Sequence, residues 1–396
     1  MKHIVFRCGL GAGRWPALLT LVCVGIASLG PVLRAEARSA VVSGTGVPRN
    51  IVTATVTVGQ NPDCLAVSPD SNTVYVANSG PFPGTVSVID VANSPVVEAT
   101  ITTPNFVNFL ALGLDGATLY VSEEPQGSGP GLVEVYDVTI PASPTLKATL
   151  TAGYYPRCMA LSPDNTELYV ANGEGALGRI GQSQNPGAVY VFGTATNTLK
   201  NIIVTNGSPF QVLFTNNGEQ VDVLNQTGAG FIQFIDTATG IVSSSIGAGG
   251  RIFGPAGMIG SNPGVFGSSG TLYVADGENY VTVCDANDGA ATKTILAVKS
   301  VFDTEPLGQP ALTANGEYLY VPYGRGGLAA NAEVDVIMRP SNNQVAMIDV
   351  TSGKIVGSLI TVGYGPVWAQ ASPDGNTLYV CNSVDGTVSV IDIKPN

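Results

Sequence analysis

The stretch Val67-Ser-Pro-Asp70-Ser-Asn-Thr73-Val-Tyr75-Val-Ala-Asn78 recurs along the chain in recognisable copies. Nearly identical sequences occur at Ala371-Ser-Pro-Asp374-Gly-Asn-Thr377-Leu-Tyr379 and at Leu161-Ser-Pro-Asp164 with Leu168-Tyr169. Weaker copies share the apolar strand but not the full turn, and they lie at Leu119-Tyr120, Val221-Asp222, Leu272-Tyr273 and Leu319-Tyr320. The sequence therefore contains seven copies of one unit.

Each unit reads as a series of short β-strands. Proline fixes φ in the turn Ser-Pro-Asp, aspartate accepts bonds from the amides that follow it, and glycine or asparagine tolerates positive φ. A second strand ending in aspartate follows most copies, as in Val86-Ser-Val-Ile-Asp90 and Val388-Ser-Val-Ile-Asp392. Each unit holds four strands of four to seven residues that are enriched in Val, Ile, Tyr and Thr and separated by Gly, Pro, Asn or Asp, and no segment shows convincing helical periodicity.

Repeats of about 40–50 residues with four strands each are typical of the blades of a β-propeller. We expect an all-β fold, a single seven-bladed β-propeller of four-stranded antiparallel blades. The last unit stops after its third strand, whereas residues 50–58 resemble a fourth strand with no preceding three. The N-terminal strand is therefore predicted to complete the last blade. The expected blades are 61–104, 105–152, 153–205, 206–248, 249–302, 303–362, and 363–393 with 50–58.

The N-terminus predicts export. Lys2, Arg7 and Arg14 precede an apolar run, and Ala35-Glu36-Ala37 offers small residues for a signal peptidase. We expect residues 1–37 to be a signal peptide, 38–49 an N-terminal extension and 50–396 the propeller. A retained membrane anchor is the alternative, but glycines and a proline shorten its apolar stretch. The predicted location is periplasmic, extracellular or at the cell surface, with no membrane span after signal cleavage.

Composition excludes several kinds of chemistry. The one histidine, His3, lies in the predicted signal peptide, so the mature chain has no imidazole for a catalytic triad or a metal site. Residues 1–37 hold four of the 17 basic and one of the 29 acidic residues, which leaves a net charge of −15. That charge disfavours nucleic acid. The plainer interpretation is that the negative charge keeps the protein soluble.

Four cysteines remain after residue 37, and each lies in an apolar strand: Cys64, Cys158, Cys284 and Cys381. We expect them to be small buried apolar residues. A bridge between Cys64 and Cys381 is the alternative.

The units Tyr-Val-Ala-Asn and Val-Ser-Val-Ile-Asp resemble the YVTN-type β-propeller repeats of secreted and surface-layer proteins. The resemblance covers residues 50–393 and implies the fold rather than a chemistry, because such propellers include structural, binding and enzymatic proteins. Lactonase-like and quinoprotein-subunit propellers share the repeat style. Any of their functions that depends on histidine does not transfer to this chain.

The longer insertions are predicted to share one face of the propeller. They are 79–84, 124–131, 173–187, 324–343 and the connection 247–257. Loops on a rigid scaffold are where binding residues concentrate, so we expect this face to carry the function.

The copies provide an internal comparison for site residues. At the end of the second strand most copies have asparagine, whereas Glu123, Asp276 and Tyr323 depart from it, with Glu124 and Glu278 beside them. These residues are either turn variants or part of a polar or cation-binding rim. Asp222 replaces the tyrosine of the six other copies, and an inward carboxylate there needs a partner.

Arginine is scarce after the signal, and Arg157, Arg251 and Arg325 lie at the loop-rich face. Arginine beside carboxylates orients an anionic or sugar-like ligand, although a surface salt bridge is the plainer interpretation.

We expect a monomeric binding or scaffold protein with a protein or glycan partner and no nucleic acid. No catalytic set is evident and no cofactor is expected, although Ca²⁺, which oxygen ligands alone can hold, is left open. The alternatives are a lactonase-like or lyase-type enzyme with a carboxylate and arginine funnel, or a propeller subunit of a redox complex. The sequence leaves catalysis undecided.

Overall fold

The computed structural model describes residues 46–127, 129–173, 187–215, 218–226, 230–247, 257–260, 271–275, 280–285, 291–296, 307–323 and 343–396. The chain divides into two compact units, Met1–Ser39 and Ala40–Asn396, and every described residue belongs to the second. The predicted signal peptide and residues 38–45 of the predicted extension lie outside the described residues. In the described part no helix has the length and apolar character that a membrane crossing requires.

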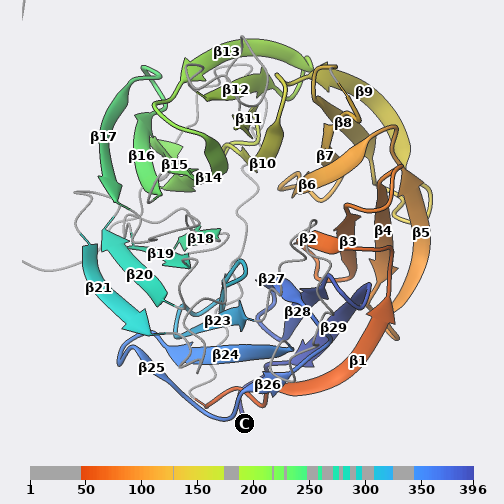
Figure 1. Cartoon of the computed structure of the whole chain (residues 1–396). Coiled ribbons are helices and arrows are strands. Elements are labelled where there is room, and N and C mark those ends of the chain that lie inside the picture. Colours follow the sequence, from red (N-terminus) through yellow and green to blue (C-terminus); the bar gives the residue numbers. More distant parts are fainter. Residues whose placement is uncertain are drawn as a thin grey trace, which may run out of the picture. The chain divides into compact units, whose positions relative to one another are not determined.

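The described strands form antiparallel sheets in which consecutive strands are neighbours, except that β1 joins the sheet of β27, β28 and β29 (Figure 1). Sheet 1 contains β2 (Pro62–Val67), β3 (Thr73–Asn78), β4 (Thr85–Asp90) and β5 (Val96–Thr102). Sheet 2 contains β6 (Phe106–Leu112), β7 (Thr118–Glu124), β8 (Leu132–Asp137) and β9 (Thr145–Thr151). Sheet 3 contains β10 (Pro156–Leu161), β11 (Glu167–Asn172), β12 (Ala188–Gly193) and β13 (Thr198–Val204).

The remaining sheets follow the same plan. Sheet 4 contains β14 (Pro209–Thr215), β15 (Gln220–Asn225), β16 (Phe231–Asp236) and β17 (Val242–Gly247). Sheet 5 contains β18 (Gly257–Gly260), β19 (Thr271–Ala275), β20 (Tyr280–Asp285) and β21 (Ala291–Leu296). Sheet 6 contains β22 (Ala311–Leu312), β23 (Tyr318–Tyr323), β24 (Gln344–Asp349), β25 (Lys354–Ile355) and β26 (Ile360–Thr361). Sheet 7 contains β27 (Pro366–Ala371), β28 (Thr377–Asn382), β29 (Thr387–Asp392) and β1 (Ile51–Thr57).

The all-β propeller arrangement is confirmed, but its sheets are less uniform than the sequence predicts. Six of them have four strands. In sheet 6 the outer strand is split into β25 and β26, which both pair with β24. Gly357 lies between the two pieces with φ of +72°, a left-handed conformation that interrupts a strand. The prediction of four strands in every blade is therefore wrong for this sheet.

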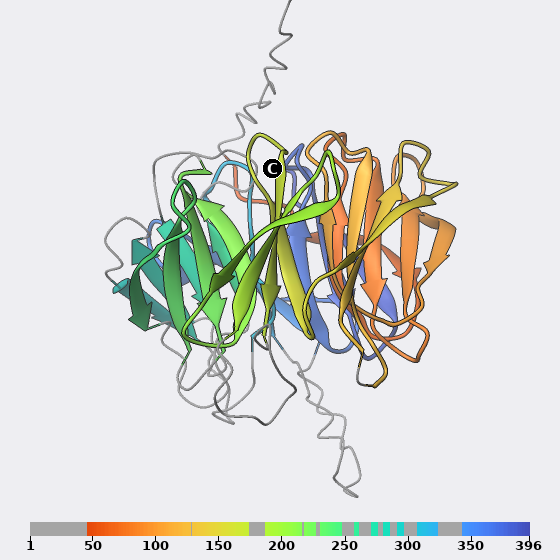
Figure 2. The same ribbon diagram turned by 90° about the horizontal axis from the view of Figure 1, so that it is seen from above.

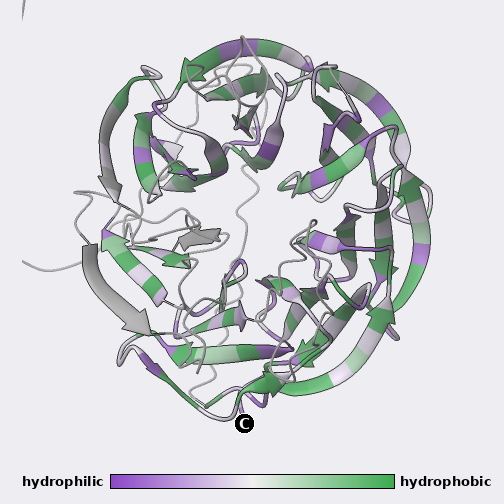
Figure 3. Ribbon diagram, viewed as in Figure 1, coloured by the Kyte–Doolittle hydropathy of each residue, from purple (hydrophilic) through white to green (hydrophobic). Residues whose placement is uncertain are grey.

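Neighbouring sheets contact one another through their inner strands, from β2 through β6, β10, β14, β18, β22 and β27 and back to β2. A perpendicular view shows the sheets standing side by side (Figure 2). Hydrophobic clusters lie between them. One joins sheets 1 and 2 through Tyr75 and Leu119, and another joins sheets 2 and 3 through Tyr120 and Leu168. Along the outer strands β5, β9 and β13 hydrophobic and polar bands alternate (Figure 3).

The turn between inner and second strands forms as its residues predict. In sheet 1 the Ser68 hydroxyl donates to Asp70 Oδ1 over 2.6 Å and accepts from the Thr73 amide over 2.9 Å. Sheet 7 repeats the second of these bonds, from the Thr377 amide to Ser372 Oγ, at 2.9 Å. The position that needs positive φ is filled by Ser71 in sheet 1 and by Gly375 in sheet 7, with φ of 62° and 72°.

The predicted pairing of the N-terminal strand is present. Strand β1 lies antiparallel to β29, with Ile51 opposite Asp392 and Val56 opposite Val388. Val56 is buried in a cluster that includes Val74 of sheet 1 and Val388 of sheet 7. The first strand of the fold thus joins its last sheet and packs against its first.

We expect Val56→Ala to lower the free energy of unfolding by about 2 kcal/mol, because it removes buried methyl groups from this cluster. The measurement is the urea midpoint of the mature chain. Thr55→Ala is the matched control, since Thr55 is exposed on the same strand, and it is expected to cost less than about 0.5 kcal/mol. Equal effects of the two substitutions would contradict a closing role for this strand.

Candidate functional site

The loop face is defined here as the face where second strands end and inner strands begin. Asn78 pairs with Pro62 there, Glu123 with Val107, and Asn172 with Pro156. The predicted insertions at 79–84 and 124–131 connect second to third strands on this face. Residues 174–186, 248–256 and 324–342 lie outside the described residues.

The recurrent asparagine of the loop face is a buried structural residue. Asn78 has no exposed surface, and its Nδ2 donates to Thr85 Oγ1 and Ser87 Oγ over 3.1 and 3.0 Å. Asn382 makes the same two bonds, to Thr387 and Ser389. A Cβ added to Gly59 would lie 2.6 Å from Asn78 Cγ, so the incoming connection crosses directly over the amide. This position is therefore interior.

Glu123 takes the asparagine position in sheet 2 and is likewise fully buried. Asn105 Nδ2 donates to its Oε2 over 3.2 Å. Glu134, at the position of Ser87, is also buried and shares a hydrogen bond with Glu123. The Tyr136 hydroxyl donates to Glu134 Oε2 over 2.5 Å. Two carboxyl groups thus replace the amide and hydroxyl of sheets 1 and 7, and Glu123 does not reach an exposed rim.

One proton stabilises this pair. Burial, the hydrogen bond to Glu134 and the charge of Glu134 raise the pKa of Glu123 to about 9. At neutral pH Glu123 is therefore protonated and donates to Glu134. Its Oε1 has no hydrogen-bond partner among the described residues. The pair is a structural acid–carboxylate contact.

The other predicted rim residues are placed separately. Tyr323 is buried, and its hydroxyl donates to Gln344 Oε1 on the neighbouring strand. Glu124 is half-buried at the end of β7. Arg251, Asp276, Glu278 and Arg325 lie outside the described residues. The described candidates are therefore not gathered into one catalytic group.

Arg157 is half-buried at the start of β10, on the loop face. Its guanidinium carbon lies 4.9 Å from the centroid of the Tyr155 ring and 5.9 Å from that of Phe210. The backbone carbonyl of Arg157 accepts from the Ser122 hydroxyl over 2.9 Å, which fixes the strand beneath. Among the described residues its side chain forms no ion pair. Arg157 therefore lies between two rings rather than against a carboxylate.

Aromatic residues at the starts of inner strands were not predicted as site residues. Phe106 lies edge-on to Phe82 with ring centroids 5.5 Å apart, and 43% of Phe82 is exposed. Tyr155 and Phe210 are half-buried beside Arg157. The signal was present in the sequence: Pro156 and Pro209 begin equivalent inner strands, and an aromatic residue adjoins each.

Asp222 is fully buried in β15, where the sister sheets have tyrosine. Thr215 Oγ1 donates to its Oδ2 over 3.1 Å and Gln220 Nε2 donates to its Oδ1 over 2.6 Å. Burial raises its pKa to about 7, although the two hydrogen bonds favour the carboxylate. Both partners come from its own sheet. Asp222 therefore has the hydrogen-bond partners that an inward carboxylate needs.

The four described cysteines are buried thiols, and Cys64 and Cys381 are not bridged. Burial raises the pKa of Cys158 to about 12 and that of Cys284 to about 11, so neither is a ready nucleophile. In the described part of the chain no three His, Cys, Asp or Glu side chains lie close enough to hold a metal ion.

Comparison with known proteins supports the fold. No family model matches the chain, so the YVTN likeness remains a resemblance. No curated protein matches it. A solved chain of hydrazine synthase from Kuenenia stuttgartiensis is similar in structure, with a TM-score of 0.64 and 19% sequence identity, covering 85% of this chain and 97% of that one. At this identity the likeness shows the fold alone.

Replacing Glu123 with glutamine should flatten the dependence of stability on pH. Glutamine keeps an acceptor for Asn105 and a donor for Glu134 but carries no titrating proton. Because the pKa of Glu123 is raised from about 4.3 in the unfolded chain, the native state binds the extra proton between pH 4.3 and about 9. Wild-type stability therefore falls as pH rises through that window, with this group adding up to about 1.4 kcal/mol per pH unit. Chemical denaturation at several pH values measures the slope.

The control for that substitution is Glu124→Gln, which removes the neighbouring carboxyl from a half-buried position. The slope of stability against pH in this variant should match that of the wild type. An unchanged slope in Glu123→Gln would show that Glu123 is already ionised in the folded protein.

Asp222→Asn should flatten the lower part of the same profile. The amide accepts from Gln220 and donates to Thr215, so the local bonds are retained. Asp222 binds its proton in the native state up to about pH 7, whereas the unfolded carboxyl loses it near pH 4. Its share of stability is full below pH 4 and is lost as pH rises to 7. If the difference in denaturation midpoint between the variant and the wild type is the same at pH 5 as at pH 8, this prediction is contradicted.

Proposed function

We propose that the chain is a seven-bladed propeller that works as an exported binding or scaffold protein, with its loop face receiving a protein or glycan partner. The observation that carries the proposal is the placement of Arg157 between Tyr155 and Phe210 on that face. A guanidinium held over aromatic rings keeps its donors directed outward in a fixed plane. Such a surface suits the flat faces of sugars and of peptide groups.

The charge distribution supports this reading. Arginine is scarce in a strongly acidic chain, so a half-exposed arginine without a carboxylate partner among the described residues is unusual. Phe82 and Phe106 extend the aromatic surface on the same face at the start of sheet 2. Aromatic residues and arginine are the residue types that dominate binding energy at interfaces.

The enzymatic alternative finds less support in the described residues. It required Glu123 to share a funnel with Arg157 and with residues that lie outside the described ranges. Glu123 has no exposed surface and is bonded to Asn105 and Glu134. A general acid must reach its substrate, and this carboxyl group is covered.

The test is capture of partners by the immobilised mature chain from an envelope extract, together with a glycan array. We expect Arg157→Ala to reduce retention of the captured protein or glycan about tenfold, because it removes the cation and loosens both rings. Capture by the wild type that disappears in the variant supports the proposal.

Arg49→Ala is the matched control. Arg49 lies 3.5 Å from Asp392 at the opposite face and is nearly half exposed, so its loss removes the same charge away from the loop face. Equal loss of retention in both variants would show that the effect comes from the loss of a positive charge and not from its position on the loop face. Unchanged retention in Arg157→Ala, with an unchanged melting temperature, would refute the role of the loop face.

A further inference from the structure

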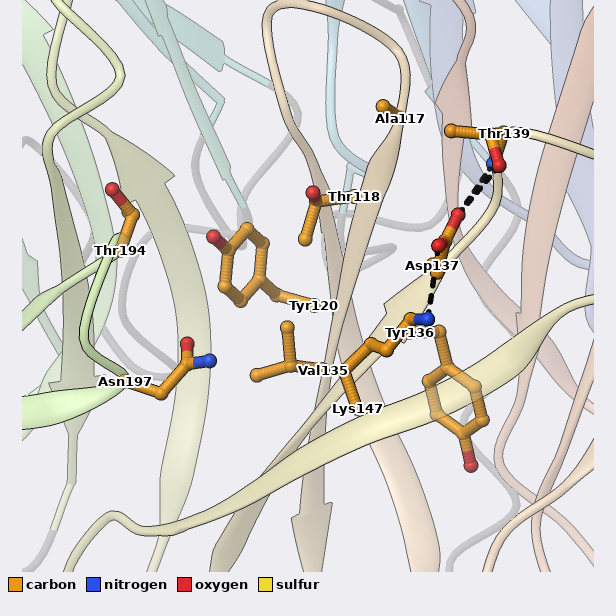
Figure 4. Close-up of a pocket in the computed structure, with 10 residues that line it drawn as sticks. All are labelled: Ala117, Thr118, Tyr120, Val135, Tyr136, Asp137, Thr139, Lys147, Thr194 and Asn197. Carbon is orange, nitrogen blue, oxygen red and sulfur yellow. Dashed lines mark hydrogen bonds and ion pairs between the residues drawn. The ribbon is translucent and has the colours of Figure 1, made fainter.

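A cavity of about 220 Å³ lies between sheets 2 and 3, at the face opposite the loop face (Figure 4). It is partly open to solvent and differs in place from the site discussed above. Its lining combines apolar and polar side chains from both sheets, namely Ala117, Thr118, Tyr120, Val135, Tyr136, Asp137, Thr139, Lys147, Thr194 and Asn197.

Asn197 is the most informative of these residues because sheets 4 and 6 have glycine at its position. The turn 193–198 of sheet 3 corresponds to 236–241 of sheet 4 and 349–354 of sheet 6. Asn197 has φ of 53°, Gly240 69° and Gly353 63°. Each amide donates to the carbonyl four residues earlier over 2.8 Å. Asparagine adopts this left-handed conformation at some cost, and here it brings an amide group into the cavity.

The Asn197 amide lacks a full set of partners. Its Oδ1 is buried, and no described residue donates to it. In Figure 4 the Nδ2 of this amide is on the side toward Val135, so Asn197 presents a hydrogen-bond donor to the cavity.

The far side of the cavity carries a fixed charged pair. Lys147 Nζ lies 3.2 Å from Asp137 Oδ2. Asp137 also accepts from the hydroxyl and amide of Thr139, over 2.7 and 3.0 Å. These bonds to Thr139, with the one from Lys147, lower the pKa of Asp137 to about 2. The site therefore presents a carboxylate and, since Lys147 is half exposed, spare ammonium donors.

Between the amide and the charged pair the wall is apolar. Tyr120 and Val135 are buried between sheets 2 and 3 and expose only small parts of their side chains to the cavity. Hydroxyl-rich rings combine an apolar face with donors and acceptors around the edge. The volume is below the roughly 300 Å³ at which pockets for larger ligands begin, so a single ring is the size that fits.

We propose that this cavity binds one sugar ring or a cyclic polyol of the same size. One ring hydroxyl accepts a hydrogen bond from Asn197 Nδ2. Hydroxyls at the other edge contact Asp137 and Lys147, and the ring lies on Val135 and Tyr120. The inference does not depend on the loop face.

The test is isothermal titration calorimetry and saturation-transfer NMR of the mature chain with D-glucose, D-galactose, D-mannose and myo-inositol. We expect at least one of them to bind at one site with a Kd near the millimolar range or below. Glycine and glutamate serve as probes for a zwitterion site. Binding of those amino acids without any of the four ring compounds would overturn the proposal, as would binding of none.

Asn197→Gly is the decisive variant, because Gly240 and Gly353 already occupy its position in the sister turns. The variant should fold with an unchanged or higher melting temperature and bind the ring compound about tenfold more weakly. Thr196→Ala is the matched control, since Thr196 is exposed in the same turn and does not line the cavity. Equal affinity in Asn197→Gly and the wild type would refute the site.

Discussion

The structure depends on one constraint: each sheet can cover its apolar faces only by packing on the sheets beside it. The hydrophobic clusters are therefore shared between neighbours, as Tyr75 and Leu119 are between sheets 1 and 2. A linear row of such sheets would leave two faces bare. Pairing of β1 with β29 brings the two ends of the described chain into one sheet, and Val56 then packs between that sheet and the first.

The sequence predicts this plan well because the plan is repeated. The Ser-Pro-Asp turn marks three of the units and the tyrosine strand marks six of the seven, and residues 50–58 show that a strand is missing at the other end. The split outer strand of sheet 6 was not predictable in the same way, because residues 354–362 have the same apolar pattern as intact strands. A single left-handed glycine, Gly357, interrupts the pairing there.

The site was predicted only in part, for a physical reason. Comparison of the copies identified Glu123 and Asp222 as unusual, and both are unusual in the structure. A period of two gives the face to which a side chain points but not what lies above it. Glu123 is covered by the entering connection and bonded to Glu134 on another strand, so a residue expected at a rim is in the interior. The aromatic residues beside Arg157 were visible in the sequence but do not depart from a strand pattern.

Repetition of the sheets also relaxes the constraint on the residue at a given turn position. Where sheets 4 and 6 hold glycine in their outer turns, sheet 3 holds Asn197, and the turn keeps the same hydrogen bond. The repeated units thus hold redundant copies of one structural solution, so a change in one copy leaves the others intact. New specificity can evolve in such a molecule one blade at a time, while the unchanged blades preserve the architecture.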